Sequence, residues 1–187
     1  MRKKFTAYNK DTGQVLFGGT ADNPEVMATE SSVIVLDVEY TDGYLVDGVH
    51  HALPPQPSEH HVFNYTTKQW EDPRTLADLK GAQWATIKQA RSAAEYAGFT
   101  WDGSIFDSDA ISQNRITGAV TLAQLSPNFT IHWTLANNST RTLSQADMIA
   151  VGVALGVHVQ TQFARAQGLR LQIDAASTPG QVAAVVW

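Results

Sequence analysis

Phe99-Thr-Trp-Asp-Gly-Ser-Ile-Phe-Asp-Ser-Asp109 is the stretch of sequence that decides the fold. Asp102-Gly103 at its centre is a two-residue turn signal, because both residue types tolerate the positive φ that a tight turn needs. Asp107 or Ser108 can cap a following helix, and Asp109 suits the positive end of that helix. The aromatic residues are suited to packing. The stretch therefore predicts a turn and a helix start, and it contains no evident catalytic device.

Three main helices are predicted around this stretch. Thr75-Leu-Ala-Asp78 has the spacing of a capping box, and the helix that it opens extends to about Ala97. A second helix extends to about Leu125. A third begins at the Ser144-Gln-Ala-Asp147 cap and extends to about Ala176. Two β-hairpins accompany these helices.

The third long segment can be interpreted in two ways. Its valines alternate from Val151 to Val159, which favours a strand. Other apolar residues follow the 4-3 spacing of a coiled coil, and the preceding cap and the absence of turn residues favour a helix. The spacing predicts a seam that is either an oligomer contact or the inner face of an intramolecular helix pair. The proposed seam residues are Met148, Leu155, Val159, Gln162, Leu169 and Ile173.

Residues 1–72 predict a small antiparallel β unit made of short strands and turns. Asp47-Gly48 is its strongest hairpin signal, and Gly13 is expected to take a positive φ in an earlier turn. Asp72-Pro73 marks the boundary. The predicted fold class is therefore α+β, with a small β attachment domain over 1–72 and a helix-rich domain over 73–187.

Composition narrows the classes of function. Residues 1–72 contain 5 Lys or Arg and 11 Asp or Glu, and residues 73–187 contain 8 and 7, for a net charge of −5 over the whole chain. This balance argues against general nucleic-acid binding, which needs a basic surface. The most apolar run, Met148–Val159, is too short to span a bilayer, so no membrane insertion is expected. The chain has no cysteine, which excludes thiolate ligands and thiol nucleophiles.

Two clusters of chemically versatile side chains have both a structural and a functional interpretation. Asp102, Asp107 and Asp109 could hold a metal or act on a sugar, but ordinary turn and cap roles account for all three. His50-His51 and His60-His61 could bind a transition metal, although adjacent residues in a strand point to opposite faces. The structural interpretation is preferred for both clusters, so no catalytic, metal or cofactor residue is assigned.

Several segments from the first helix to the start of the third carry a family resemblance. They are Trp84-Ala-Thr-Ile-Lys-Gln-Ala-Arg91, Gly98-Phe-Thr-Trp-Asp-Gly103, Phe106-Asp-Ser-Asp-Ala-Ile-Ser112 with Arg115-Ile116, Trp133-Thr-Leu-Ala-Asn-Asn138 and Leu143-Ser-Gln-Ala-Asp-Met148. Through these segments, residues 75–187 resemble a domain of unknown function found in the tail-fibre and tail-tip proteins of tailed bacteriophages. The first half also resembles, more loosely, N-terminal pieces of phage tail proteins. The segments that carry this looser resemblance are Gly43-Tyr-Leu-Val-Asp-Gly48 and Phe63-Asn-Tyr-Thr-Thr-Lys-Gln-Trp70.

The resemblance implies a non-enzymatic structural protein of the virion tail, assembled in the host cytoplasm. It would be a fibre, a fibre adaptor or a tail-tip subunit. Its expected partners are other tail proteins, further copies of itself (a trimer is favoured) and a host surface receptor. Two alternatives stay open: a fibre-assembly chaperone absent from the mature virion, and a carbohydrate-active enzyme using the three aspartates.

Overall fold

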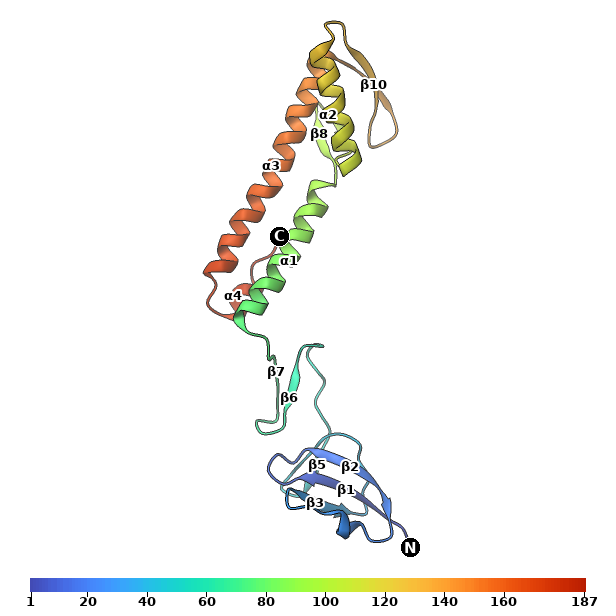
Figure 1. The fold of residues 1–187 in the computed structure, drawn as a ribbon, viewed down its shortest axis with the longest axis vertical. Helices are drawn as coiled ribbons and strands as arrows, with labels where there is room; N and C mark the ends of the chain where they lie inside the picture. The colour runs from blue at the N-terminus through green and yellow to red at the C-terminus, as the bar shows by residue number, and fades with distance from the viewer. The chain divides into compact units, whose positions relative to one another are not determined.

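The computed structural model describes all 187 residues, which form two compact units, Met1–Arg74 and Thr75–Trp187. The division lies two residues after the predicted one. The first unit contains short antiparallel sheets, and the second contains all the α-helices (Figure 1). The predicted α+β class is confirmed.

The first unit is built on a three-stranded antiparallel sheet in the order β2-β1-β3. Four consecutive residues of the central strand, Phe5 to Tyr8, are buried, so both faces of this strand are covered. Two short hairpins, β4–β5 and β6–β7, complete the unit with a 3-10 helix, η1. The bounds are β1 Lys3–Asn9, β2 Val15–Ala21, η1 Pro24–Met27, β3 Ser32–Leu36, β4 Tyr44–Val46, β5 Val49–His51, β6 Val62–Asn64 and β7 Gln69–Glu71.

Turn chemistry sets the connections of this unit. Gly13 has a φ of 65°, as predicted, and its amide donates to the Asn9 carbonyl. Asp47 and Gly48 both have positive φ, at 49° and 80°, which is the conformation of a two-residue hairpin turn. Both predicted turns are confirmed.

The second unit contains four helices and two hairpins, β8–β9 and β10–β11. The helix ends follow the caps in the sequence, since the predicted Thr75–Asp78 and Ser144–Asp147 capping boxes are both formed. The bounds are α1 Leu76–Glu95, β8 Phe99–Trp101, β9 Ser104–Phe106, α2 Ala110–Leu125, β10 Thr130–Thr134, β11 Thr140–Ser144, α3 Gln145–Ala175 and α4 Pro179–Ala183.

Helix α3 is the central element of this unit, because α2 packs against its first half and α1 packs against its second half (Figure 1). Both pairs are antiparallel. Gln145 Nε2 donates to the Ala123 carbonyl near the start of α3, and Lys80 Nζ donates to the Asp174 carbonyl near its end. A cluster around Phe106 and Met148 fills the α2 half, and a smaller cluster around Ile87 and Ile173 fills the α1 half.

The junction between α1 and α2 corrects one prediction. Asp109, and not Asp107 or Ser108, is the N-cap of α2, and its carboxylate accepts from the amides of Ile111 and Ser112. Ser108 is fully buried and joins the two helices instead: its hydroxyl donates to the Glu95 carbonyl and accepts from the Gly98 amide. Three adjacent residues of capping type made the position ambiguous by one or two residues.

The segment from Val151 to Val159 lies within the helix α3, so the strand interpretation is wrong and the chosen helix is confirmed. Gly152 lies where α2 crosses closely, since a Cβ at this position would lie 2.6 Å from Cγ2 of Val120. Gly156 faces open space. None of the helices combines the length and the hydropathy that a membrane span requires.

Candidate functional site

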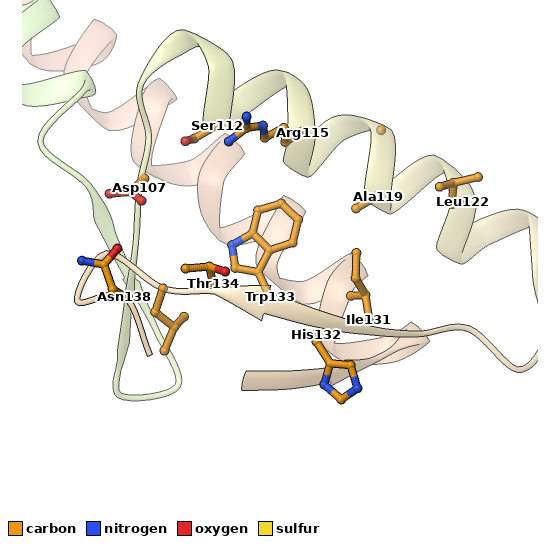
Figure 2. Close-up of a pocket in the computed structure, with 12 residues that line it drawn as sticks. Asp107, Ser112, Arg115, Ala119, Leu122, Ile131, His132, Trp133, Thr134 and Asn138 are labelled. Carbon is orange, nitrogen blue, oxygen red and sulfur yellow. The ribbon is translucent and has the colours of Figure 1, made fainter. Parts of the chain in front are cut away.

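A cleft of about 670 Å³ lies between α2 and the β10–β11 hairpin. Strand β10 alternates its side chains, so Ile131 and Trp133 face α2. The His132 ring forms a hydrogen bond with the hydroxyl of Thr142 on the paired strand β11. Figure 2 shows the Trp133 ring standing between the strand and the helix. The lining residues are Asp107, Ser112, Arg115, Gly118, Ala119, Leu122, Ile131, His132, Trp133, Thr134, Leu135 and Asn138.

The cleft is apolar at one end and polar at the other. Leu122 and Ile131 lie at the apolar end, and Asp107 and Asn138 lie together at the polar end (Figure 2). A flat ring beside a few hydrogen-bonding groups is an arrangement found in small-molecule sites. The cleft brings together one aromatic platform, one carboxylate and one guanidinium, from Arg115.

The three predicted aspartates do not converge in this cleft. Asp102 lies in the β8–β9 turn and pairs with the Arg141 guanidinium, and Asp109 caps α2. Only Asp107 lines the cleft. The hydrogen bonds from Ser112, through its hydroxyl and its amide, lower the pKa of the Asp109 carboxyl. The structure therefore gives two of these carboxylates specific structural partners, which agrees with the preferred interpretation from sequence.

Replacing Asp109 by alanine is expected to lower the thermal stability of the second unit, because two amide donors at the start of α2 lose their acceptor. Asparagine at this position should retain most of the stability, since it also accepts these bonds. Asp107→Ala is the matched control two residues away. Thermal melts followed by helical circular dichroism would measure all three; equal losses for the alanine variants would contradict the capping role.

The predicted seam of α3 lies mostly inside its own unit. Met148 and Leu155 belong to the cluster shared with α2, and Ile173 belongs to the cluster shared with α1. The remaining seam residues, Val159, Gln162 and Leu169, are half-buried on the same side. The chain's own helices thus occupy the seam, which is the intramolecular alternative that the sequence left open.

A second row of small and apolar residues follows the opposite side of α3. We call it the outer row. Its large members are strongly exposed: Val153 by 62%, Val157 by 61% and Leu171 by 70%. The members of the outer row are Ala146, Ala150, Val153, Val157, Gln160, Ala164, Gly168, Leu171 and Ala175. This row was not predicted from the sequence, although its first six members follow the same 4-3 spacing as the seam.

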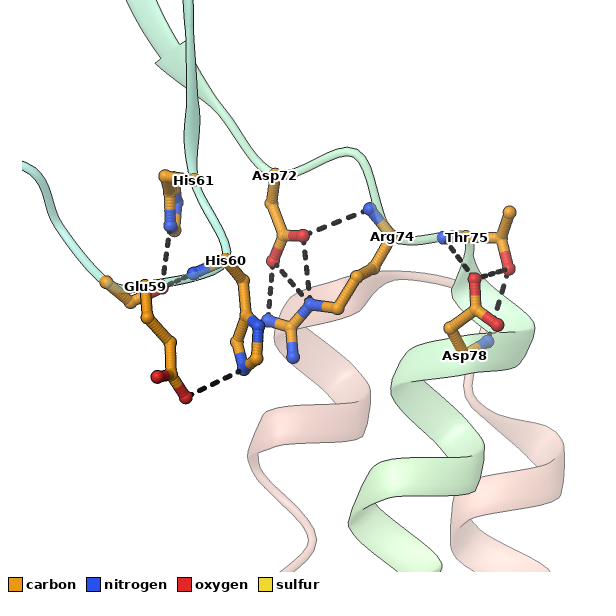
Figure 3. A network of polar contacts seen from close by, with 8 residues as sticks. Glu59, His60, His61, Asp72, Arg74, Thr75 and Asp78 are labelled. Carbon is orange, nitrogen blue, oxygen red and sulfur yellow. Dashed lines mark hydrogen bonds and ion pairs between the residues drawn. The ribbon is translucent and has the colours of Figure 1, made fainter.

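The predicted histidine clusters separate into individual structural contacts. The His50 ring stacks on Tyr40 with centroids 3.5 Å apart, and its Nδ1 lies 3.2 Å from the Tyr8 hydroxyl. His51 stacks on the Tyr44 ring. His60 lies 3.7 Å from the Glu59 carboxylate, and His61 bonds the Ser58 hydroxyl (Figure 3). The structure brings together no three His, Asp or Glu side chains that could hold a metal ion.

A carboxylate near these histidines is held by a neighbouring arginine. Asp72 accepts hydrogen bonds from the guanidinium and from the backbone amide of Arg74, at distances of 2.6 to 3.1 Å (Figure 3). These contacts hold the pKa of the Asp72 carboxyl well below its usual range. Asp72, at the predicted domain boundary, thus fixes the conformation of the chain at the end of the first unit.

The first unit is expected to lose stability in mild acid through His50. Burial lowers the pKa of this ring, the neighbouring His51 adds to the effect, and Asp42 opposes it. The unfolded chain therefore binds a proton more readily than the folded unit, so stability is retained above about pH 6.5 and decreases below it. Hydrogen exchange of the β1–β3 amides, corrected for intrinsic rates, should show lower protection at about pH 5 than at about pH 7.

His50→Gln should remove most of this difference, and the exposed His60→Gln should leave it unchanged. A pH dependence that survives in His50→Gln would assign the effect to another group.

Comparison with known proteins places the second unit in a family. A model described as a domain of unknown function (DUF4376) matches residues 78–186. No curated protein matches the chain, and no solved structure does. The matched segment begins in the first turn of α1 and ends one residue before Trp187, so it covers nearly all of the second unit and more than half of the chain. The chain belongs to the DUF4376 family.

Proposed function

We propose that this protein is a structural component of a bacteriophage tail that acts through protein–protein contacts. The observation that carries the proposal is the apolar surface on α2 and α3. Seven large hydrophobic side chains of these two helices are more than a third exposed. They are Ile111, Leu122, Leu125, Val153, Val157, Phe163 and Leu171. Contiguous exposed apolar positions are typical of interaction surfaces, and Val153, Val157 and Leu171 share one face of α3.

The tail context is supported by the resemblance of residues 75–187 to a domain of phage fibre and tail-tip proteins. The proposed role is that of a fibre, fibre-adaptor or tail-tip subunit, whose β unit contacts one partner and whose helical unit contacts another. A component of this kind needs stiff elements, and α3 is one continuous helix of 31 residues. At about 1.5 Å per residue it extends for about 46 Å.

Mass spectrometry of purified particles of a phage that encodes this chain tests the proposal. The expected result is stoichiometric presence with the other tail proteins. Presence in assembly intermediates and absence from mature particles would support the alternative, a fibre-assembly chaperone. Absence from both would contradict a tail role.

The cleft beside Trp133 provides a second test. The proposal assigns no chemistry to Asp107 or Asp109. Replacing both by asparagine should therefore leave host adsorption unchanged, and it should not reduce any polysaccharide-cleaving activity of the particles. Loss of such an activity in Asp107→Asn/Asp109→Asn particles would favour a carbohydrate-active enzyme.

A further inference from the structure

The outer row of α3 is uncharged, like the seam on the opposite side, but the chain's own helices do not cover it. Over 30 positions from Ala146 to Ala175 it contains no charged residue, and Gln160 is its only side chain with polar atoms. The four charged side chains of α3 lie off this row and have partners within the second unit. Asp147 closes the N-terminal capping box, Arg165 lies over the Trp187 ring, and Arg170 pairs with Asp174.

A row without charge can face a copy of itself, because no like charges meet across a symmetry axis. The outer row also varies in size in an ordered way. Val153 and Val157 are its bulky members before Gln160, and Leu171 is the bulky member after it. The remaining positions hold alanine or glycine, and a Cβ at Gly168 would meet nothing within 4 Å.

We propose that the outer row of α3 is the contact between two copies of this chain, with the two α3 helices antiparallel about a twofold axis beside Gln160. In this register Val153 of one copy faces Gly168 of the other, and Val157 faces Ala164. Leu171 faces Ala150. Every bulky side chain thus meets a small one, as interdigitating layers require.

Gln160 gives this register a fixed centre. It lies beside the axis and meets Gln160 of the other copy, and two amides can donate to and accept from each other. A parallel arrangement, including the parallel trimer favoured from the sequence, would place valine on valine and alanine on alanine in successive layers. The small layers would then be left loosely packed.

The size of the contact predicts a reversible dimer. A helix face about 46 Å long and about 10 Å wide gives a flat footprint of roughly 460 Å² on each copy, or roughly 900 Å² in total. Specific interfaces below about 1,200 Å² are typically weak or transient. This inference depends on α3 alone, so it can fail separately from the proposed tail role. A chain that is monomeric but present in virions would contradict the dimer and leave the tail role standing. A chain that forms dimers but is absent from virions would contradict the tail role and leave the dimer standing.

Light scattering of the full chain over a concentration series is the first test. The mass is expected to rise from 20.4 kDa towards twice that value. Val153→Glu/Val157→Glu should remain monomeric at the highest concentration, with unchanged circular dichroism. Ile111→Glu is the matched control, because Ile111 is equally exposed, at 62%, but lies on α2 outside the outer row. A wild-type monomer throughout, or a trimer, would overturn the proposal.

Disulfide cross-linking tests the direction of the helices, and the absence of native cysteine makes every cross-link assignable. Val153→Cys/Gly168→Cys is expected to give covalent dimers on mild oxidation, and Val153→Cys alone is not. Efficient dimer formation by Val153→Cys alone would show parallel helices and contradict the proposed axis.

Discussion

Phe106→Ala is expected to destabilise the helix-rich unit by about 3–5 kcal/mol, the range for removing a fully enclosed phenylalanine. Phe106 is 0% exposed. Its ring stacks on Phe99 at 5.5 Å and meets Trp101 edge-on at 6.1 Å. The same cluster includes Met148 at the start of α3, so the cavity would lie where β9 meets two helices.

Chemical denaturation followed by helical circular dichroism would measure this loss, because all the α-helices belong to the second unit. Ile105→Ala is the control: Ile105 is the preceding residue of the same strand, but it is 56% exposed. A loss below about 1 kcal/mol for Phe106→Ala would show that the cluster collapses around the missing ring.

Gly13→Ala is expected to destabilise the first unit strongly, although it adds only one methyl group. Gly13 has a φ of 65°, and a Cβ there would lie 2.2 Å from the Leu45 carbonyl oxygen. Because that oxygen belongs to the backbone, the β4 strand itself would have to move. Gly48→Ala is the control: Gly48 has a similar φ of 80°, but a Cβ there meets nothing within 4 Å.

The control measures the cost of the left-handed conformation alone, about 1–2 kcal/mol. Gly13→Ala should cost clearly more, because the steric conflict is added to the same conformational cost. Hydrogen exchange of the β1–β3 amides would compare the two variants. Equal loss of protection would show that the turn relaxes without strain.

Local chemistry made much of the fold predictable from sequence. The Asp47-Gly48 turn and the capping boxes at Thr75 and Ser144 depend on residues within four positions of each other, and all three were located correctly. The strand order β2-β1-β3 and the packing of both α1 and α2 on α3 depend on contacts between distant segments. No pattern of spacing in a single segment contains that information.

Helix α3 shows why its two sides could not be told apart from sequence. Val151, Leu155 and Val159 face inward, and Val153 and Val157 face outward. A helix with apolar residues on two opposite sides produces the alternation of a strand, which explains the ambiguity at this segment. The 4-3 spacing occurs on both sides, so it could not identify the side that the chain covers itself.

The cleft beside Trp133 could not be predicted either. Its residues come from α2, from β10 and from the loops around them, and only the fold brings them together. Asp102, Asp107 and Asp109 formed a candidate site in the sequence because they are close to each other along the chain. In the structure, turn, cap and pairing roles separate Asp102 and Asp109 from Asp107.

The path of the chain through the second unit has a mechanical consequence. Residue 75 lies near the C-terminal end of α3, where Lys80 Nζ donates to the Asp174 carbonyl, and residue 187 lies beside Arg165 in the second half of α3. Tension applied between these two residues would first peel α4 and the last turns of α3 away from α1. The half that contains α2 and both hairpins would bear no load until α4 and the end of α3 had separated from α1. This half would therefore stay folded under a moderate force.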